Sequence, residues 1–182
     1  AVFEQKVKAG APGVEVYNFG ISDSAEAAYR VLEHIQQANL DLLFIDMLTY
    51  ATSSTVACIF QATRLPIVLV ALQPDAALDY ERATTHMQLY NDDICALPEF
   101  ASVAIRMGRP VPPMIIGTLH GDPQAEAEIR SYCQIANVLH SLRRARIGQL
   151  GHVLEAMLDM HTDSTLLTAT FGCHLVQLEV DD

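Results

Sequence analysis

LLFIDMLTYATSS, residues 42–54, is the stretch that decides the fold of this chain. Its apolar run, Leu42 to Leu48, ends abruptly in small hydroxyl residues. The run predicts a strand buried on both faces, and the hydroxyl residues predict the loop and helix cap that follow. In an open α/β sheet, ligands bind outside the carboxyl ends of the strands. We therefore look for function first between Asp46 and Thr55.

The segments on either side of this stretch alternate between strand and helix patterns. The helix between the first two strands begins at Ser22-Asp-Ser24, and Pro123 begins a long helix that runs to Leu142. Short connections between such elements predict a parallel sheet with right-handed crossovers. The fold class is therefore α/β, with a Rossmann-like (flavodoxin-like) sheet covered by helices on both faces. The predicted strands are Val14–Phe19, Leu42–Leu48, Ile67–Leu72 and Met114–Gly117.

A second α/β unit begins after the long helix. Residues 145–152 read as a strand, a glycine turn and the start of a helix, Asp163 starts a further helix, and His174–Val180 alternates as a strand. Gly148 and Gly151 form only half of a dinucleotide-binding fingerprint, so we predict no nucleotide site there. The predicted domains are 1–143, a Rossmann-like domain, and 144–182, the beginning of a second one.

Composition excludes several classes of protein. The chain has 182 residues, a net charge of −11 and only 11 Lys and Arg, which argues against nucleic-acid binding. No window reaches the length of apolar sequence that a membrane span needs, and no signal-peptide core is visible. The four cysteines form no C-x-x-C pair, which favours a reducing, cytoplasmic compartment. The chain begins without Met, and in what looks like the tail of a helix, so we expect a processed chain or a fragment.

Asp46 is the single residue of the sequence that most clearly suggests a functional site. A carboxylate at the end of a buried strand is similar to the phospho-acceptor of response-regulator receivers, but those domains also need a Lys after a late strand. The only lysines here are Lys6 and Lys8. The simpler interpretation is that Asp46 caps a loop or accepts bonds from backbone amides. Ser53 and Ser54 lack the flanking glycines of a nucleophile elbow, and we interpret them as helix caps.

His152 and His161 lie in a locally acidic segment with Glu155, Asp159 and Asp163. A metal site there is one interpretation, and a half-exposed segment with scattered polar residues is the favoured one. No H-x-x-x-H or H-E-x-x-H pair exists. An arginine cluster is interpreted as a solvated helix end rather than an anion site: Arg130, Arg143, Arg144 and Arg146.

Several stretches together resemble the L-arabinose isomerase and L-fucose isomerase superfamily, above all its arabinose-isomerase-like members. They occur in the family's order and cover most of the chain from about Gly13. The matching stretches are DLLFIDMLTYATSST (41–55), LPIVLVALQPDAALDY (65–80), PEF (98–100) and RIGQLGH (146–152), continuing through MLD (157–159) to FG (171–172).

The resemblance implies an aldose–ketose isomerase that uses a divalent metal, usually manganese (Mn²⁺), bound by residues outside this chain. It also implies that residues 1–143 lack the domain's first strand. Tyr50 and Met157 match family residues of the sugar pocket. Gln73, at the end of the adjacent strand, could reach the same crevice. Family members form trimers or hexamers, so the resemblance further implies a homo-oligomer with a small-molecule sugar as partner.

Two functional hypotheses remain open besides the receiver. One is an aldose–ketose isomerase, or a fragment of one, that contributes a sugar-pocket wall and oligomer contacts. The alternative is a non-enzymatic sugar-binding or regulatory module, which rests on the same βαβ pattern and on the lack of catalytic residues in this chain. For both, the candidate site residues are Tyr50, Gln73 and Met157, with no catalytic residue and no metal ligand assigned.

Overall fold

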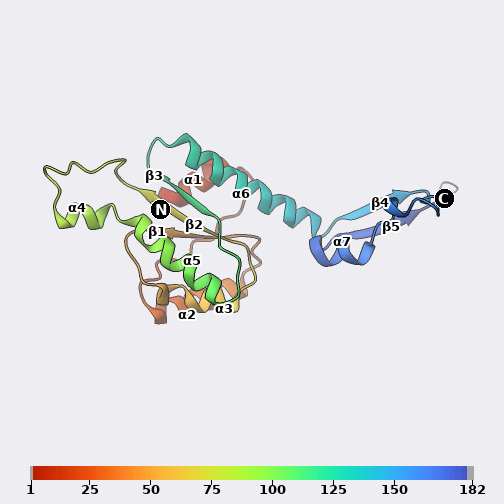
Figure 1. Cartoon of the computed structure of the whole chain (residues 1–182), viewed down its shortest axis with the longest axis horizontal. Coiled ribbons are helices and arrows are strands. Elements are labelled where there is room, and N and C mark those ends of the chain that lie inside the picture. The colour runs from red at the N-terminus through yellow and green to blue at the C-terminus, as the bar shows by residue number, and fades with distance from the viewer. Residues whose placement is uncertain (1, 180–182) are drawn as a thin grey trace. The chain divides into compact units, whose positions relative to one another are not determined.

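The structure is a computed structural model that describes residues 2–179. The chain folds as two compact units, Ala1–Gln134 (unit 1) and Ile135–Asp182 (unit 2), and their elements are labelled in Figure 1. The division falls inside the long helix α6 (Pro123–Leu142). Each unit is described below by itself.

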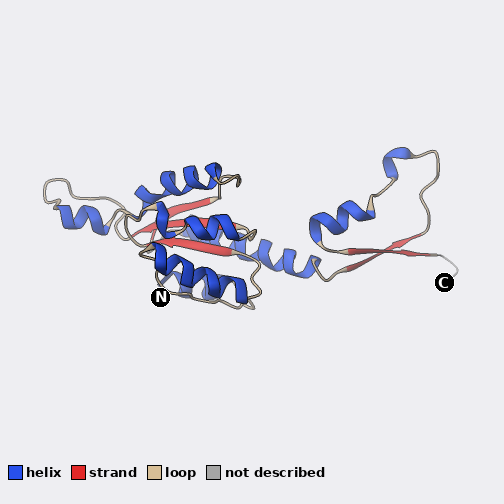
Figure 2. Cartoon of the chain, turned by 90° about the horizontal axis from the view of Figure 1, so that it is seen from below, coloured by secondary structure: helices blue, strands red, loops and turns tan. Residues whose placement is uncertain are grey.

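Unit 1 is built on a three-stranded parallel sheet in the order β1-β2-β3. Its strands are β1 (Leu43–Met47), β2 (Ile67–Gln73) and β3 (Met114–Thr118), drawn in red in Figure 2. Ile45 lies opposite Leu69, which lies opposite Met114. The predicted α/β class, with a parallel sheet flanked by helices, is confirmed.

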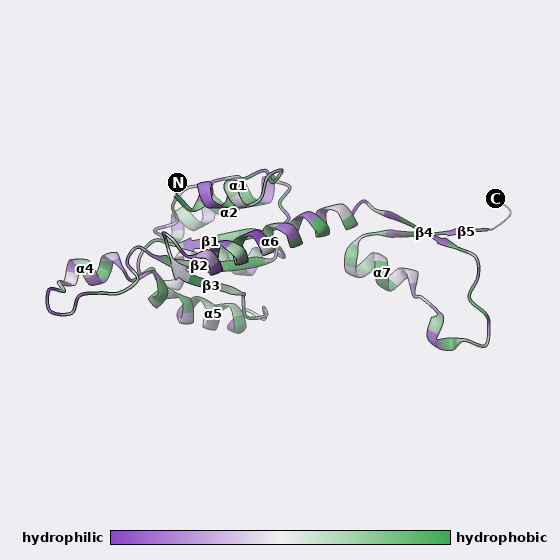
Figure 3. Cartoon of the chain, turned by 90° about the horizontal axis from the view of Figure 1, so that it is seen from above, coloured by the Kyte–Doolittle hydropathy of each residue, from purple (hydrophilic) through white to green (hydrophobic). Residues whose placement is uncertain are grey.

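Helices cover both faces of this sheet because its central strand carries apolar side chains on both of its sides. Leu69 and Ala71 pack against α2 (Ala25–Gln37), α3 (Ala57–Ala62) and α5 (Leu97–Arg106). On the other face, Val68, Val70 and Leu72 pack against α1 (Val2–Gly10) and α6. Figure 1 shows α1 and α6 above the sheet and the other three helices below it. Hydrophilic and hydrophobic residues follow each other along α6 in Figure 3, as a helix with one buried side requires.

The central strand of the sheet is β2 rather than β1. Six of its seven residues are buried, whereas Leu43 to Asp46 of β1 are only half-buried. The prediction that residues 42–48 form a strand buried on both faces was therefore right about packing on both faces, where apolar residues reach both core clusters, but wrong about the extent of burial. The physical reason is that β1 has one strand neighbour and β2 has two.

Val14–Phe19 is not a strand. Val14 and Val16 pack against the sheet core while Glu15 and Tyr17 are exposed, so the alternation is real. None of these residues, however, pairs with a strand in the described part of the chain. Alternation reports which side chains are buried, and it does not supply the backbone partner that makes a strand.

The segments that connect the elements of unit 1 contain three short helices: η1 (Ser53–Thr55), α4 (Thr85–Tyr90) and η2 (Asp93–Ala96). The last of these contacts both β1 and β2. No helix within residues 2–179 combines the length and apolar character needed to cross a bilayer.

Unit 2 is a βαβ unit with a two-stranded parallel sheet. β4 (Arg146–Leu150) pairs with β5 (His174–Leu178), and α7 (Ser164–Phe171) connects them. Both strands and the helix start at Asp163 agree with the sequence prediction, although Val180 lies outside the described residues. No helix follows Gly151 directly: residues 151–163 form a loop whose one helical turn is η3 (Leu158–Met160). The helix expected there was therefore wrong.

Candidate functional site

The carboxyl ends of β1, β2 and β3 meet at one edge of the parallel sheet of unit 1. Three connections leave from this edge: residues 48–56, 74–92 and 119–122. This edge is where an α/β sheet places its ligand. Tyr50 lies in the first connection, and Gln73 is the last residue of β2.

Glu99 holds Tyr50 and its loop. The Tyr50 hydroxyl donates to Glu99 Oε2 at 3.3 Å, and the Ser53 backbone N–H donates to Glu99 Oε1 at 2.7 Å. These bonds lower the pKa of Glu99, and the bond from Ser53 has the largest effect. The negative charge of Glu99 in turn raises the pKa of the Tyr50 phenol. The Tyr50 side chain stays 48% exposed, so its ring is available at the surface. Sequence reasoning missed Glu99, although its position in the first turn of a helix was a usable signal.

Gln73 lies beside Asn91. Its Nε2 donates to the Asn91 backbone carbonyl at 2.8 Å. The Asn91 side chain accepts from Asp75 N at 2.8 Å and donates to Asp75 O at 3.0 Å, which ties together the two ends of the 75–91 excursion. Asn91 is buried. The Gln73 amide nitrogen therefore holds this segment on the sheet edge.

Asp46 and Asp93 form a pair of perturbed carboxyl groups at the same edge. Asp93 is 3% exposed, and its Oδ1 has no hydrogen-bond partner in the described structure. Burial, with help from Asp92, raises the pKa of Asp93 to about 6. Burial and then the charge of Asp93 raise the pKa of Asp46 to about 7. Two carboxyl groups that titrate near neutrality are typical of groups that move protons, although ion-pair networks in structural positions also shift pKa values.

The expected backbone bonds of Asp46 are not formed. None of residues 2–179 is hydrogen-bonded to its carboxyl group, so the interpretation of Asp46 as a loop cap was wrong. Ser53 and Ser54 likewise do not cap α3, whose N-cap is Val56 with no side-chain bond. They form η1 instead, and the Ser54 hydroxyl lies 2.9 Å from that of Thr52.

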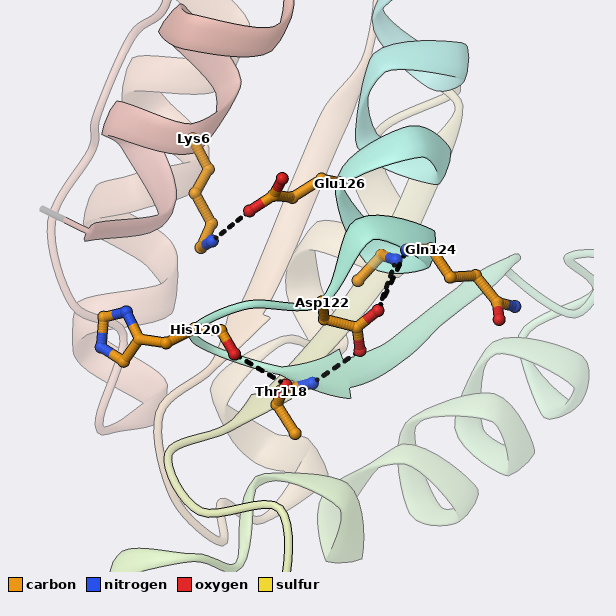
Figure 4. A network of polar contacts seen from close by, with 7 residues as sticks. Lys6, Thr118, His120, Asp122, Gln124 and Glu126 are labelled. Carbon is orange, nitrogen blue, oxygen red and sulfur yellow. Dashed lines mark hydrogen bonds and ion pairs between the residues drawn. The ribbon is translucent and has the colours of Figure 1, made fainter.

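The third connection, residues 119–122, is held in place by hydrogen bonds to Asp122 (Figure 4). Its carboxylate accepts from the backbone N–H groups of Thr118, Gln124 and Ala125 at 3.0–3.1 Å. These bonds lower the pKa of Asp122. The N-terminus of α6 is thereby occupied by the chain's own carboxylate, so it is not available to a ligand phosphate.

The remaining predicted site residue, Met157, belongs to unit 2. It precedes η3 in the loop after β4, and its side chain is 46% exposed. The structure thus brings Tyr50 and Gln73 to one edge of unit 1 and places Met157 in the other unit. His152, also in that loop, pairs with Glu179 at 2.9 Å. Among residues 2–179, no three His, Cys, Asp or Glu side chains are arranged to hold a metal ion.

No protein-family model and no curated protein matches this chain. The resemblance to sugar isomerases therefore stays a prediction from the sequence.

Proposed function

We propose that this chain forms one wall of the sugar pocket of an aldose–ketose isomerase, with Tyr50 as the contact residue. The observation that carries the proposal is the exposed Tyr50 ring, held by Glu99 at the carboxyl edge of a parallel sheet. An apolar ring face next to hydrogen-bonding groups suits a sugar, which presents C–H faces and hydroxyls together.

Mn²⁺, which the sequence resemblance implies, does not fit the side chains described in unit 1 or unit 2. Its preferred ligands are carboxylates and imidazoles, and no group of three or more such side chains is arranged for a metal in the part of the chain that the structure describes. The proposal therefore assigns this chain no metal ligand. Its own residues would bind and orient the sugar, and Asp46 and Asp93 would be able to exchange a proton near neutral pH.

The first experiment titrates the ¹⁵N-labelled chain with L-arabinose and L-fucose and follows the side-chain amide of Gln73, which reports on the proposed site in unit 1. Replacing Tyr50 with Ala is expected to weaken binding about tenfold, the scale of one aromatic contact. Tyr29→Ala is the matched control, because Tyr29 is also an exposed tyrosine of unit 1 but lies on α2. Equal affinities of the two variants would contradict the role of Tyr50.

The second experiment separates the enzyme from a non-enzymatic sugar-binding module. That alternative is favoured by the lack of a metal-binding group among the described residues. The natural protein that contains this chain is assayed with Mn²⁺ for isomerisation of a panel of L-sugars. Turnover supports the isomerase, whereas metal-independent binding without turnover of any sugar supports the module.

The proposal also includes a cytoplasmic location and assembly into a trimer or hexamer. Light scattering coupled to size exclusion measures the assembly directly. A strictly monomeric natural protein would contradict this part of the proposal without touching the role of Tyr50.

A further inference from the structure

A hollow of about 350 Å³ lies in unit 2, at the carboxyl ends of β4 and β5. It has the position that parallel sheets give to ligands, and its volume falls at the lower end of the range for small-molecule sites. Its polar lining comes from three places: the ends of both strands, the loop after β4 and the first residue of α7. These polar residues are Gln149, Gln177, His152, His161, Thr162 and Ser164.

The βαβ connection brings these residues together. Gln149 and Gln177 lie opposite each other in the parallel register, so their side chains share one face of the sheet. The loop 151–163 then carries imidazole and hydroxyl groups to the same place, and Leu175 adds an apolar part to the lining. All of these residues are neighbours within unit 2.

Several of these polar groups have unused hydrogen-bonding capacity. Gln177 Nε2 donates to the Gly151 carbonyl, and His152 pairs with Glu179. The side chains of Gln149, His161, Thr162 and Ser164 form no hydrogen bond with any of residues 2–179. Hydroxyl and carboxamide groups each donate and accept, and a neutral imidazole does the same through its two nitrogens.

Charge narrows the class of ligand. No Lys or Arg lines the hollow, and Glu179 lies beside it through its pair with His152. The N-terminus of α7 is already capped by Asp163, whose Oδ1 accepts from Thr165 N and Leu166 N at 2.9 and 3.0 Å. An anion would therefore find no Lys or Arg charge, only the imidazoles of His152 and His161, and the first of these is already paired with Glu179. A metal ion would find no carboxylate in the lining, and no metal-binding group is present among the described residues.

We infer that this hollow binds an uncharged, hydroxyl-rich small molecule of monosaccharide size. Each ligand hydroxyl both donates and accepts, as the lining groups do, and Leu175 and Val153 offer apolar contact to ligand carbons. The inference stands apart from the proposed role of Tyr50, because every lining residue lies in unit 2.

The test is a titration of the whole ¹⁵N-labelled chain with L-arabinose, followed through the side-chain amides of Gln149 and Gln177. Saturable shifts at both amides, at millimolar concentrations, are expected. Inorganic phosphate and Mg²⁺, titrated separately, are expected to leave them unchanged. No saturable shift with the sugar, or tighter binding of phosphate at the same amides, would overturn the inference.

A matched pair of variants locates the site. Thr162→Val removes one lining hydroxyl at nearly constant shape, and its dissociation constant is expected to rise about 2–10-fold, the scale of one hydrogen bond. Thr165→Val changes a nearby threonine that does not line the hollow, and wild-type affinity is expected. Backbone spectra of both variants check that unit 2 keeps its fold. If a folded Thr162→Val variant binds as tightly as Thr165→Val, the inference fails.

The same titration on the Tyr50→Ala variant, with the side-chain amide of Gln73 followed as the reporter of unit 1, keeps the two proposals distinguishable. Loss of binding at unit 1 with persistent shifts at Gln149 and Gln177 supports the hollow as a separate site. Loss of the shifts in unit 2 as well would contradict its independence.

Discussion

Units 1 and 2 have the same architecture, in which parallel strands are joined by helices, but they differ in how far their strands are buried. In unit 1, β2 lies between two strands and two helical layers, and six of its residues are buried. In unit 2, four of the five residues of β4 are exposed, and Cys173 is the only core residue within 135–179. A parallel sheet is normally covered on both faces, and two strands alone are marginal in water. A βαβ pattern thus predicts topology in both units, but a stable core only where a second layer is present.

The largest expected effect tests the core of unit 1 against the surface of unit 2. Phe60 is fully buried and meets Phe100 edge to face, with ring centroids 6.4 Å apart. Phe60→Ala is expected to lower the free energy of unfolding by about 3–5 kcal/mol, because it leaves a cavity. Leu166→Ala, at an exposed position on α7, is expected to change it by less than about 0.5 kcal/mol. Urea denaturation followed by circular dichroism measures both, and similar losses would contradict the comparison.

A pair of strand glycines tests packing in the two sheets. A Cβ on Gly117 of β3 would lie 2.4 Å from Asp122 Oδ2 and 2.9 Å from Ala125 Cβ. Gly117→Ala is expected to cost about 2–3 kcal/mol, because it displaces the carboxylate that caps α6. In β4, a Cβ on Gly148 would meet only the side chain of Leu178, which is 42% exposed and able to move. Gly148→Ala is therefore expected to be within about 0.5 kcal/mol of wild type. A larger loss for Gly148→Ala in urea denaturation would contradict the looser packing of unit 2.

The smallest effect concerns pH. The pKa of Asp46 is raised from 3.8 to about 7, so the folded state favours the protonated carboxyl. This contribution is fully present below pH 3.8 and is lost as the pH rises toward 7, and Asp93 acts in the same direction. Asp46→Asn removes the ionisation and is expected to make the chain more stable than wild type by about 1–2 kcal/mol at pH 8, with little difference at pH 4.

Denaturation midpoints measured across this pH range check the prediction. Asp23→Asn, at an exposed position before α2, is the control and is expected to follow the wild-type profile. An Asp46→Asn variant with the same pH dependence as wild type would show that Asp46 is not a buried titrating group.

Much of the fold could be predicted because it depends on local pattern. The apolar runs that became β1, β2 and β3 and the Asp163 helix start were visible in the sequence. Only the location of the site could be predicted, at the end of the strand that carries Asp46; its contacts could not. Glu99, which accepts the hydrogen bond of Tyr50, lies 49 residues after Tyr50 in the sequence. Asp93, which raises the pKa of Asp46, lies 47 residues after Asp46. No local spacing connects such pairs.

The sequence by itself determined the α/β class, the parallel direction of the strands and the absence of an apolar helix long enough to span a membrane in the described chain. These features follow from the periodicity and length of apolar runs, which act within one element. Only the tertiary structure decided that β2 is the central strand, that Val14–Phe19 has no strand partner, and that Asp46 and Asp93 share one edge. Burial, backbone pairing and charge interaction depend on neighbours from distant parts of the chain, and these are chosen when the layers pack.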